Sequence, residues 1–170
     1  FGIACYYTPF FFMVGNAIAQ SAQPIISYNY GAERWNLVRE VRSMLLRTSL
    51  AVGVVVAILF VAIPRTLVGL FVDVDSAAGI LAIEGFPYYA MGVVFFILNV
   101  AIIGYYQSIE RTRQATLFVL LRGLIFVLPC FMLLPKMFGI SGIWLAMPVS
   151  ETLTLAVVLI MSFVARTKRA

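Results

Sequence analysis

Polar side chains that interrupt long apolar segments are the residues in this sequence best suited to do chemistry. Asn16, Gln20 and Gln23 recur at intervals of four and three residues, so they share one face of a helix. Glu84 and Glu151 are carboxylic acids within apolar segments. Polar groups inside a membrane are costly and usually functional, so these residues are candidates for a wet cavity, a substrate contact or a proton carrier.

Glu151 stands about halfway along its apolar segment and is the most deeply placed acid in the sequence. An unpaired carboxylate there would be expensive, so we expect it to be protonated, paired or in contact with water. Arg122, in the preceding apolar segment, is a candidate partner, although the two fall at different depths by sequence. Interhelical hydrogen bonding is the structural alternative for the amides, and a static packing pair for Glu151. The cavity candidates are Asn16, Gln20, Asn99 and Glu151.

Glu84 lies about two helical turns inside the third apolar segment. Desolvation at that depth would favour the neutral carboxyl group and let it carry a proton. The alternative is an interfacial glutamate that reaches water.

The sequence argues against enzymatic chemistry. It contains no histidine, which excludes catalytic triads and metal sites built on that residue. It also lacks the G-x-x-x-x-G-K-[ST] loop that binds nucleotide phosphates. The net charge of +5 comes from cations at the ends of apolar segments rather than along one basic face, which does not indicate nucleic-acid binding. We therefore predict no catalytic residue, metal site or cofactor.

Membrane helices are the elements that must position these side chains. The 170 residues are 63% hydrophobic and 11% charged, with a mean hydropathy of +1.03, whereas soluble domains are about 25% charged. A transmembrane helix needs about 20 mainly apolar residues, and a β-barrel strand would alternate polar and apolar positions, which residues 50–63 do not. The sequence predicts an all-α polytopic membrane bundle of about five helices, near residues 3–26, 45–63, 77–105, 115–134 and 140–164.

The distribution of cations predicts the orientation in the membrane. Five crossings place the termini on opposite sides, and cytoplasmic loops carry an excess of Lys and Arg, so the cation-rich side and the C-terminus are assigned to the cytoplasm. The other side has only Arg65 and Lys136. The cation-rich side would hold Arg34, Arg39, Arg42, Arg47, Arg111, Arg113, Arg122, Arg166, Lys168 and Arg169.

Residues 23–32 read QPIISYNYGA and join the first predicted helix to a basic stretch. Pro24 removes a backbone donor and bends the helix near its end, and Gly31 can adopt positive φ and terminate it. Tyr28 and Asn29 lie between them. The four residues mark either a plain helix terminus or a hinge for gating.

Four stretches resemble the C-terminal half of the multidrug and toxic compound extrusion (MATE) transporters, in the order of that family. Residues 23–32 are similar to the signature that ends the second helix of each half. Residues 105–111, with Y-Y-Q and an arginine, resemble the end of the tenth helix. Residues 122–129, with an arginine and a proline, resemble the eleventh. Residues 139–151, with the pattern G-x-x-G-x-W…P-x-x-E, look like the start of the twelfth.

The resemblance implies that residues 1–170 form the C-terminal lobe of a longer two-lobed transporter and lack the first helix of that lobe. It implies export of amphipathic or cationic drugs across the bacterial inner membrane by antiport with H⁺ or Na⁺. The expected partners are membrane lipid and an N-terminal lobe of the same chain, which would carry the coupling aspartate. Some members place an acid in the middle of the tenth helix, but residues 91–99 contain none, so that cation site is not expected here.

Two alternatives belong to other classes of protein. A flippase for lipid-linked saccharides would need several cations in its cavity to hold pyrophosphate, whereas nearly all cations here lie at segment ends. A non-transporting membrane subunit would copurify with a fixed partner and show no substrate-dependent change in stability.

Overall fold

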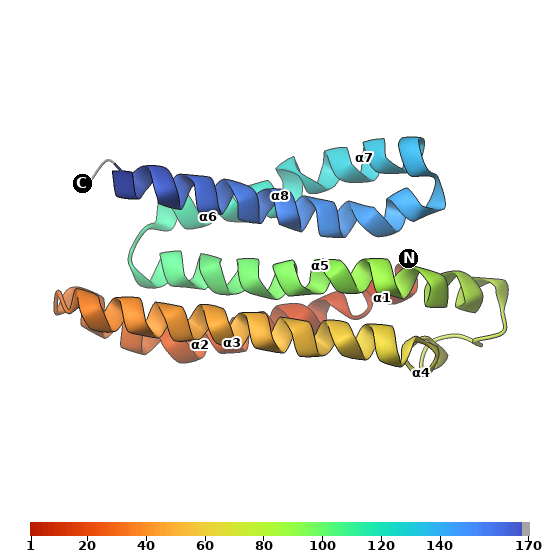
Figure 1. Cartoon of the computed structure of the whole chain (residues 1–170), viewed down its shortest axis with the longest axis horizontal. Helices are drawn as coiled ribbons and strands as arrows, with labels where there is room; N and C mark the ends of the chain where they lie inside the picture. Colours follow the sequence, from red (N-terminus) through yellow and green to blue (C-terminus); the bar gives the residue numbers. More distant parts are fainter. Residues whose placement is uncertain (168–170) are drawn as a thin grey trace.

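The computed structural model describes the backbone of residues 1–167 and the side chains of residues 1–162. This part of the chain is helical and contains no strand (Figure 1). Five of its helical segments are long and apolar enough to cross a membrane: Gly2–Gly31, Trp35–Ala62, Ala77–Ser108, Thr112–Phe138 and Ile140–Ser162. The predicted all-α polytopic membrane bundle is therefore confirmed.

Two of the five spans are interrupted, and one short helix lies between the second and third spans. The first consists of α1 and α2, and the fourth of α6, a π-helical turn and α7. The elements are α1 (Gly2–Cys5), α2 (Thr8–Gly31), α3 (Trp35–Ala62), α4 (Pro64–Gly69), α5 (Ala77–Ser108), α6 (Thr112–Leu120), the π-helix (Leu121–Ile125), α7 (Val127–Phe138) and α8 (Ile140–Thr167).

The second span begins about ten residues earlier than the apolar pattern indicates. The basic stretch at residues 35–47 is itself helical and continues into the apolar part of α3. Arginine is a good helix former, so charged residues end the apolar segment without ending the helix. This extension places several arginines on a helix surface of fixed geometry rather than on a loop.

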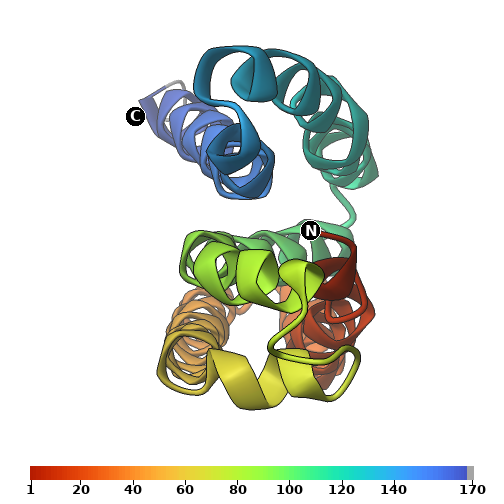
Figure 2. The same ribbon diagram turned by 90° about the vertical axis from the view of Figure 1, so that its right-hand side faces the viewer.

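Helix α5 is the centre of the bundle. It packs against α2 and α3 on one side and against α8 on the other (Figure 2). In its most apolar stretch 67% of the residues are buried, against 17% to 44% in the other spans. Small residues allow these close approaches: a Cβ added at Gly104 would lie 2.6 Å from the Cβ of Ala19 on α2, and one at Gly92 would lie 3.0 Å from Pro148 on α8.

Two turns of the same form close the bundle at one end, which we call the cation-rich end (left in Figure 1). Each turn contains a Glu-Arg pair whose glutamate is left-handed, with φ 56° at Glu33 and φ 59° at Glu110. The arginine amide then donates back to a helix carbonyl, from Arg34 to Asn29 and from Arg111 to Tyr106, both at 2.9 Å. These bonds satisfy the last carbonyls of α2 and α5.

The structure corrects the expectation that Gly31 adopts positive φ. Gly31 is the last residue of α2, and among the described glycines only Gly139 has a positive φ. The helical hydrogen bonding continues for one more residue, because the Ala32 amide donates to the Tyr28 carbonyl. The left-handed position therefore falls on Glu33.

Candidate functional site

A buried ion pair joins three helices in the interior of the bundle. Arg122 donates to Glu151 Oε1 from Nη2 at 2.8 Å and from Nε at 3.1 Å. Asn99 Nδ2 donates to Glu151 Oε2 at 2.7 Å and to the Glu151 backbone carbonyl at 2.9 Å. The side chains of Arg122 and Glu151 are only 11% and 4% exposed. Both carboxylate oxygens of Glu151 thus receive hydrogen bonds, which offsets the cost of burying its charge.

An irregular turn in the fourth span places Arg122 in this network. The residue lies in the π-helix Leu121–Ile125, between α6 and α7. Short π-helical turns occur frequently at functional sites, because the extra residue redirects the side chains around it. The Arg122 guanidinium lies over the ring of Phe96, with Cζ 4.0 Å from the ring centroid. This geometry adds a cation–π attraction to the ion pair.

Asn99 leaves one acceptor of the network without a donor. Asn99 is 1% exposed, and its side-chain oxygen Oδ1 receives no hydrogen bond from the described residues. A buried polar atom of this kind costs free energy and often marks a position with a functional role. Oδ1 could accept from water or contact a cation beside Glu151.

An open pocket with a volume of about 410 Å³ lies against the ion pair. Arg122 and Glu151 form part of its wall, and most of the remaining lining is apolar or aromatic. Tyr89 and Thr8 are among the lining residues, and the Tyr89 hydroxyl lies 2.6 Å from Thr8 Oγ1. The other aromatic residues that line the pocket are Phe1, Phe12, Phe96 and Phe131. Such a surface suits an amphipathic molecule with a small polar or charged part.

The structure brings together only part of the predicted cavity set. Asn99 and Glu151 are in direct contact and share Arg122 as a partner. Asn16 is half-buried and Gln20 is exposed on α2, and neither lines the pocket at Glu151. The common helical face of these two amides therefore does not reach the ion pair.

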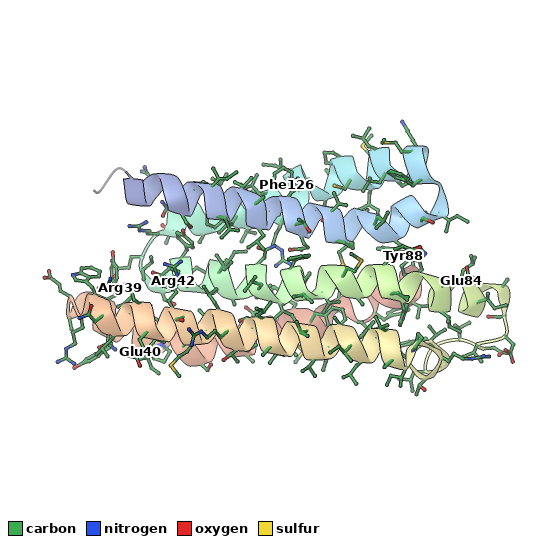
Figure 3. All side chains as sticks on the ribbon, viewed as in Figure 1. Arg39, Glu40, Arg42, Glu84, Tyr88 and Phe126 are labelled. Carbon is green, nitrogen blue, oxygen red and sulfur yellow. The ribbon has the colours of Figure 1, made fainter. Side chains whose placement is uncertain are left out.

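Glu84 and the residues at the end of α2 lie away from the ion pair. Glu84 is exposed and lines a separate hollow with Tyr88 and Trp144. Figure 3 shows Glu84 and Tyr88 toward the start of α5. Pro24 lies inside α2 and is exposed, as is Tyr28. Asn29 is buried, and its Nδ2 donates to the Ile25 carbonyl at 2.9 Å. This bond joins the Asn29 side chain to its own helix.

Arg122 also changes the charge count used to predict orientation. It lies within the fourth span rather than at its end, so the cation-rich side holds nine of the ten assigned cations. Arg166, Lys168 and Arg169, among these nine, fall outside the residues whose side chains the structure describes. The excess over Arg65 and Lys136 remains large.

Sequence reasoning missed Phe96, Tyr89 and Thr8 as parts of the site. Phe96 precedes Asn99 by three residues, so both lie on the face of α5 that meets Glu151. That spacing was available in the sequence once Asn99 had been singled out. Thr8 and Tyr89 offered no comparable signal, because their contact links residues that are 81 positions apart.

Comparison with known proteins places these features in a family. A family model described as MatE matches residues 1–132, which covers the first three spans and most of the fourth. No curated protein and no solved structure matches the chain. Glu151 lies beyond the matched residues, whereas Asn99 and Arg122 lie within them. The match extends over well more than half of the chain, which therefore belongs to the MatE family of membrane transporters.

Proposed function

We propose that the chain forms the C-terminal lobe of a two-lobed antiporter that exports amphipathic or cationic compounds in exchange for H⁺ or Na⁺. Membership of the MatE family supports transport in general. The observation that carries the more specific proposal is the aromatic pocket with the Arg122–Glu151 pair in its wall. An apolar surface would hold the body of the compound, and the acid would select its charge.

A cationic compound in this pocket competes with Arg122 for two partners. The Glu151 carboxylate attracts any cation, and the Phe96 ring attracts cations through its face. Entry of the compound's cationic group would therefore displace the guanidinium from one or both. The free energy for this exchange stays small because one buried cation replaces another, so the compound can also leave.

The π-helix is the element that would respond to this exchange. Arg122 is held there by Glu151 and Phe96, and release of its side chain removes the contacts that favour the irregular turn. Return to regular α-helix would rotate α7 relative to α6. Loading of the pocket would thereby be linked to movement of the fourth span, which alternating access requires.

The partner lobe and the orientation complete the proposal. An N-terminal lobe of the same transporter would supply the other half of the cavity and the acid that couples to H⁺ or Na⁺. The excess of cations supports a cytoplasmic location for the cation-rich end in a bacterial inner membrane. The pocket would then face the lobe interface, where transporters of this type bind substrate.

The flippase alternative is less well supported by the pocket. Among the residues that line it, Arg122 is the one cation, and its charge is balanced by Glu151. A pyrophosphate group carries several negative charges and would need more cations than this. A non-transporting subunit is the third candidate. The transport assay below separates the antiporter from both alternatives, and copurification with a fixed partner would mark the subunit.

Proteoliposomes that contain the full-length protein test the proposal. A pH gradient and a Na⁺ gradient are imposed in separate experiments. We expect a fluorescent amphipathic cation to move under one of them, and the gradient that drives the movement identifies the coupling ion. Liposomes without protein are the control for passive leakage. Absence of movement under both gradients, with protein shown to be folded, would contradict the antiporter proposal.

A further inference from the structure

A second large hollow lies at the cation-rich end, away from the ion pair. Its volume is about 580 Å³, and it is formed by the end of α2, the start of α3, the end of α5, the turn into α6 and Ser162 of α8. Three arginines line it, with aromatic rings between them. The residues that define this basic pocket are Arg39, Arg42, Arg111, Tyr30, Trp35 and Tyr105.

Helix α3 and the turn after α5 contribute the three arginines of the same hollow. Arg39 and Arg42 are three residues apart on α3 and share one helix face. Arg111 follows the left-handed Glu110, in the turn that connects α5 to α6. Figure 3 shows Arg39 and Arg42 on the side of α3 that faces α5 and α8, and Glu40 on the opposite side. The basic pocket is thus built from separate parts of the chain.

No carboxylate neutralises these arginines within the described side chains. The ion pairs found there are Arg65–Asp75 and Arg122–Glu151, and neither involves the basic pocket. Arg39 Nη2 donates to Asn36 Oδ1 at 2.6 Å, which orients the guanidinium without cancelling its charge. Three positive charges around one hollow repel each other, and an anion bound among them would offset that repulsion.

The aromatic groups place the basic pocket at the depth of lipid headgroups. Tyr and Trp concentrate at membrane–water interfaces. The Arg42 guanidinium lies over the Tyr105 ring, 5.3 Å from its centroid, and the rings of Tyr30 and Trp35 are 5.3 Å apart. Buried Val38 and Ile109 complete the lining with apolar surface. A ligand with both phosphate and hydrocarbon parts matches this combination.

We propose that the basic pocket binds the phosphate group of an anionic membrane lipid. Arg39, Arg42 and Arg111 contact the phosphate oxygens, since guanidinium groups form charge-assisted hydrogen bonds with phosphate. Basic pockets between helices at a membrane surface bind anionic headgroups in this way. The bound lipid joins the α2–α3 hairpin to the α5–α6 turn. This site is independent of the compound that the protein exports.

Lipid titration of the purified full-length protein tests the site. The midpoint of thermal unfolding in detergent is followed while phosphatidylglycerol is added, with phosphatidylcholine as the neutral lipid. We expect phosphatidylglycerol alone to raise the midpoint. Each arginine near an anionic lipid contributes about fivefold to affinity, so Arg42→Gln with Arg111→Gln should raise the half-saturating lipid concentration about 25-fold. Arg111→Gln alone should raise it about fivefold, which provides a second variant if the double variant folds poorly.

A matched charge control and a soluble anion separate the outcomes. The double variant of exposed Arg47→Gln and Arg113→Gln removes the same charge outside the basic pocket and should leave the titration unchanged. An equal loss in this control, or no stabilisation by phosphatidylglycerol, would overturn the proposal. Stabilisation by glycerol 3-phosphate equal to that by the lipid would assign the pocket to a soluble anion and would also overturn it.

Discussion

Arg122→Gln is expected to lower the free energy of unfolding by about 3–5 kcal/mol, because it leaves a buried carboxylate without its cation. Glu151 would keep only the Asn99 amide as a side-chain donor, and its side chain is 4% exposed. The cation–π contact with Phe96 is lost in the same step. Denaturant unfolding of the purified protein measures the change. Arg113→Gln, at an exposed position of α6, is the control for removal of a positive charge and should have little effect.

Glu151→Gln also leaves one buried charge without its partner, but it should lower the free energy of unfolding less than Arg122→Gln does, because the Arg122 side chain is 11% exposed against 4% for Glu151. The glutamine carbonyl can still accept a hydrogen bond, and Arg122 keeps its position over Phe96. We therefore expect Glu151→Gln to reduce export more than it reduces the amount of folded protein in the membrane. Equal losses of export and folded protein in this variant would make Glu151 a structural residue. A stability loss below about 1 kcal/mol in Arg122→Gln would contradict a tightly coupled pair.

Gly85→Ala is expected to disrupt the packing of α5 against α8. A Cβ at this position would overlap the indole ring of Trp144, which is 4% exposed and packs against Phe1 and Phe86. The ring cannot move into the core without displacing these neighbours, so the helices must separate. Overpacking of this kind costs about 1–3 kcal/mol and sometimes more. The unfolding midpoint of the purified variant measures the effect.

Gly123→Ala is the matched control for Gly85→Ala. An added Cβ at Gly123 meets nothing within 4 Å, although this residue also lies in a helical segment close to the ion pair. We expect it to be neutral or slightly stabilising, because alanine loses less backbone entropy than glycine on folding. If both variants lost stability equally, helical conformation rather than the Trp144 contact would explain the effect.

The membrane helices could be predicted from the sequence because length and apolar character are local properties. The start of α3 could not, since its basic residues are helical but outside the apolar segment. Gly31 is a similar case: a local preference suggested positive φ there, whereas Gly31 is the last helical residue of α2 and Glu33 took that conformation. Local chemistry therefore located the elements better than it located their boundaries.

The ion pair was predictable only in part. An acid and an arginine in neighbouring apolar segments suggested a partnership, but depth counted along regular helices placed them apart. The π-helix at Leu121–Ile125 changes the direction of Arg122, and no residue pattern in the sequence predicted this π-helix. The aromatic lining of the pocket was hidden among 14 Phe and 8 Tyr residues, whose directions depend on how the helices pack.

The double variant Arg122→Gln with Glu151→Gln tests most directly whether the ion pair serves transport. Both buried charges are removed together, and the two amides can still hydrogen-bond, so folding should return close to that of the unmodified protein. Export of a cationic compound, measured in proteoliposomes per folded molecule, should remain at least about tenfold lower, a deficit of roughly 1.4 kcal/mol in the transport barrier. Export restored together with folding would show that the pair is structural and would contradict the account.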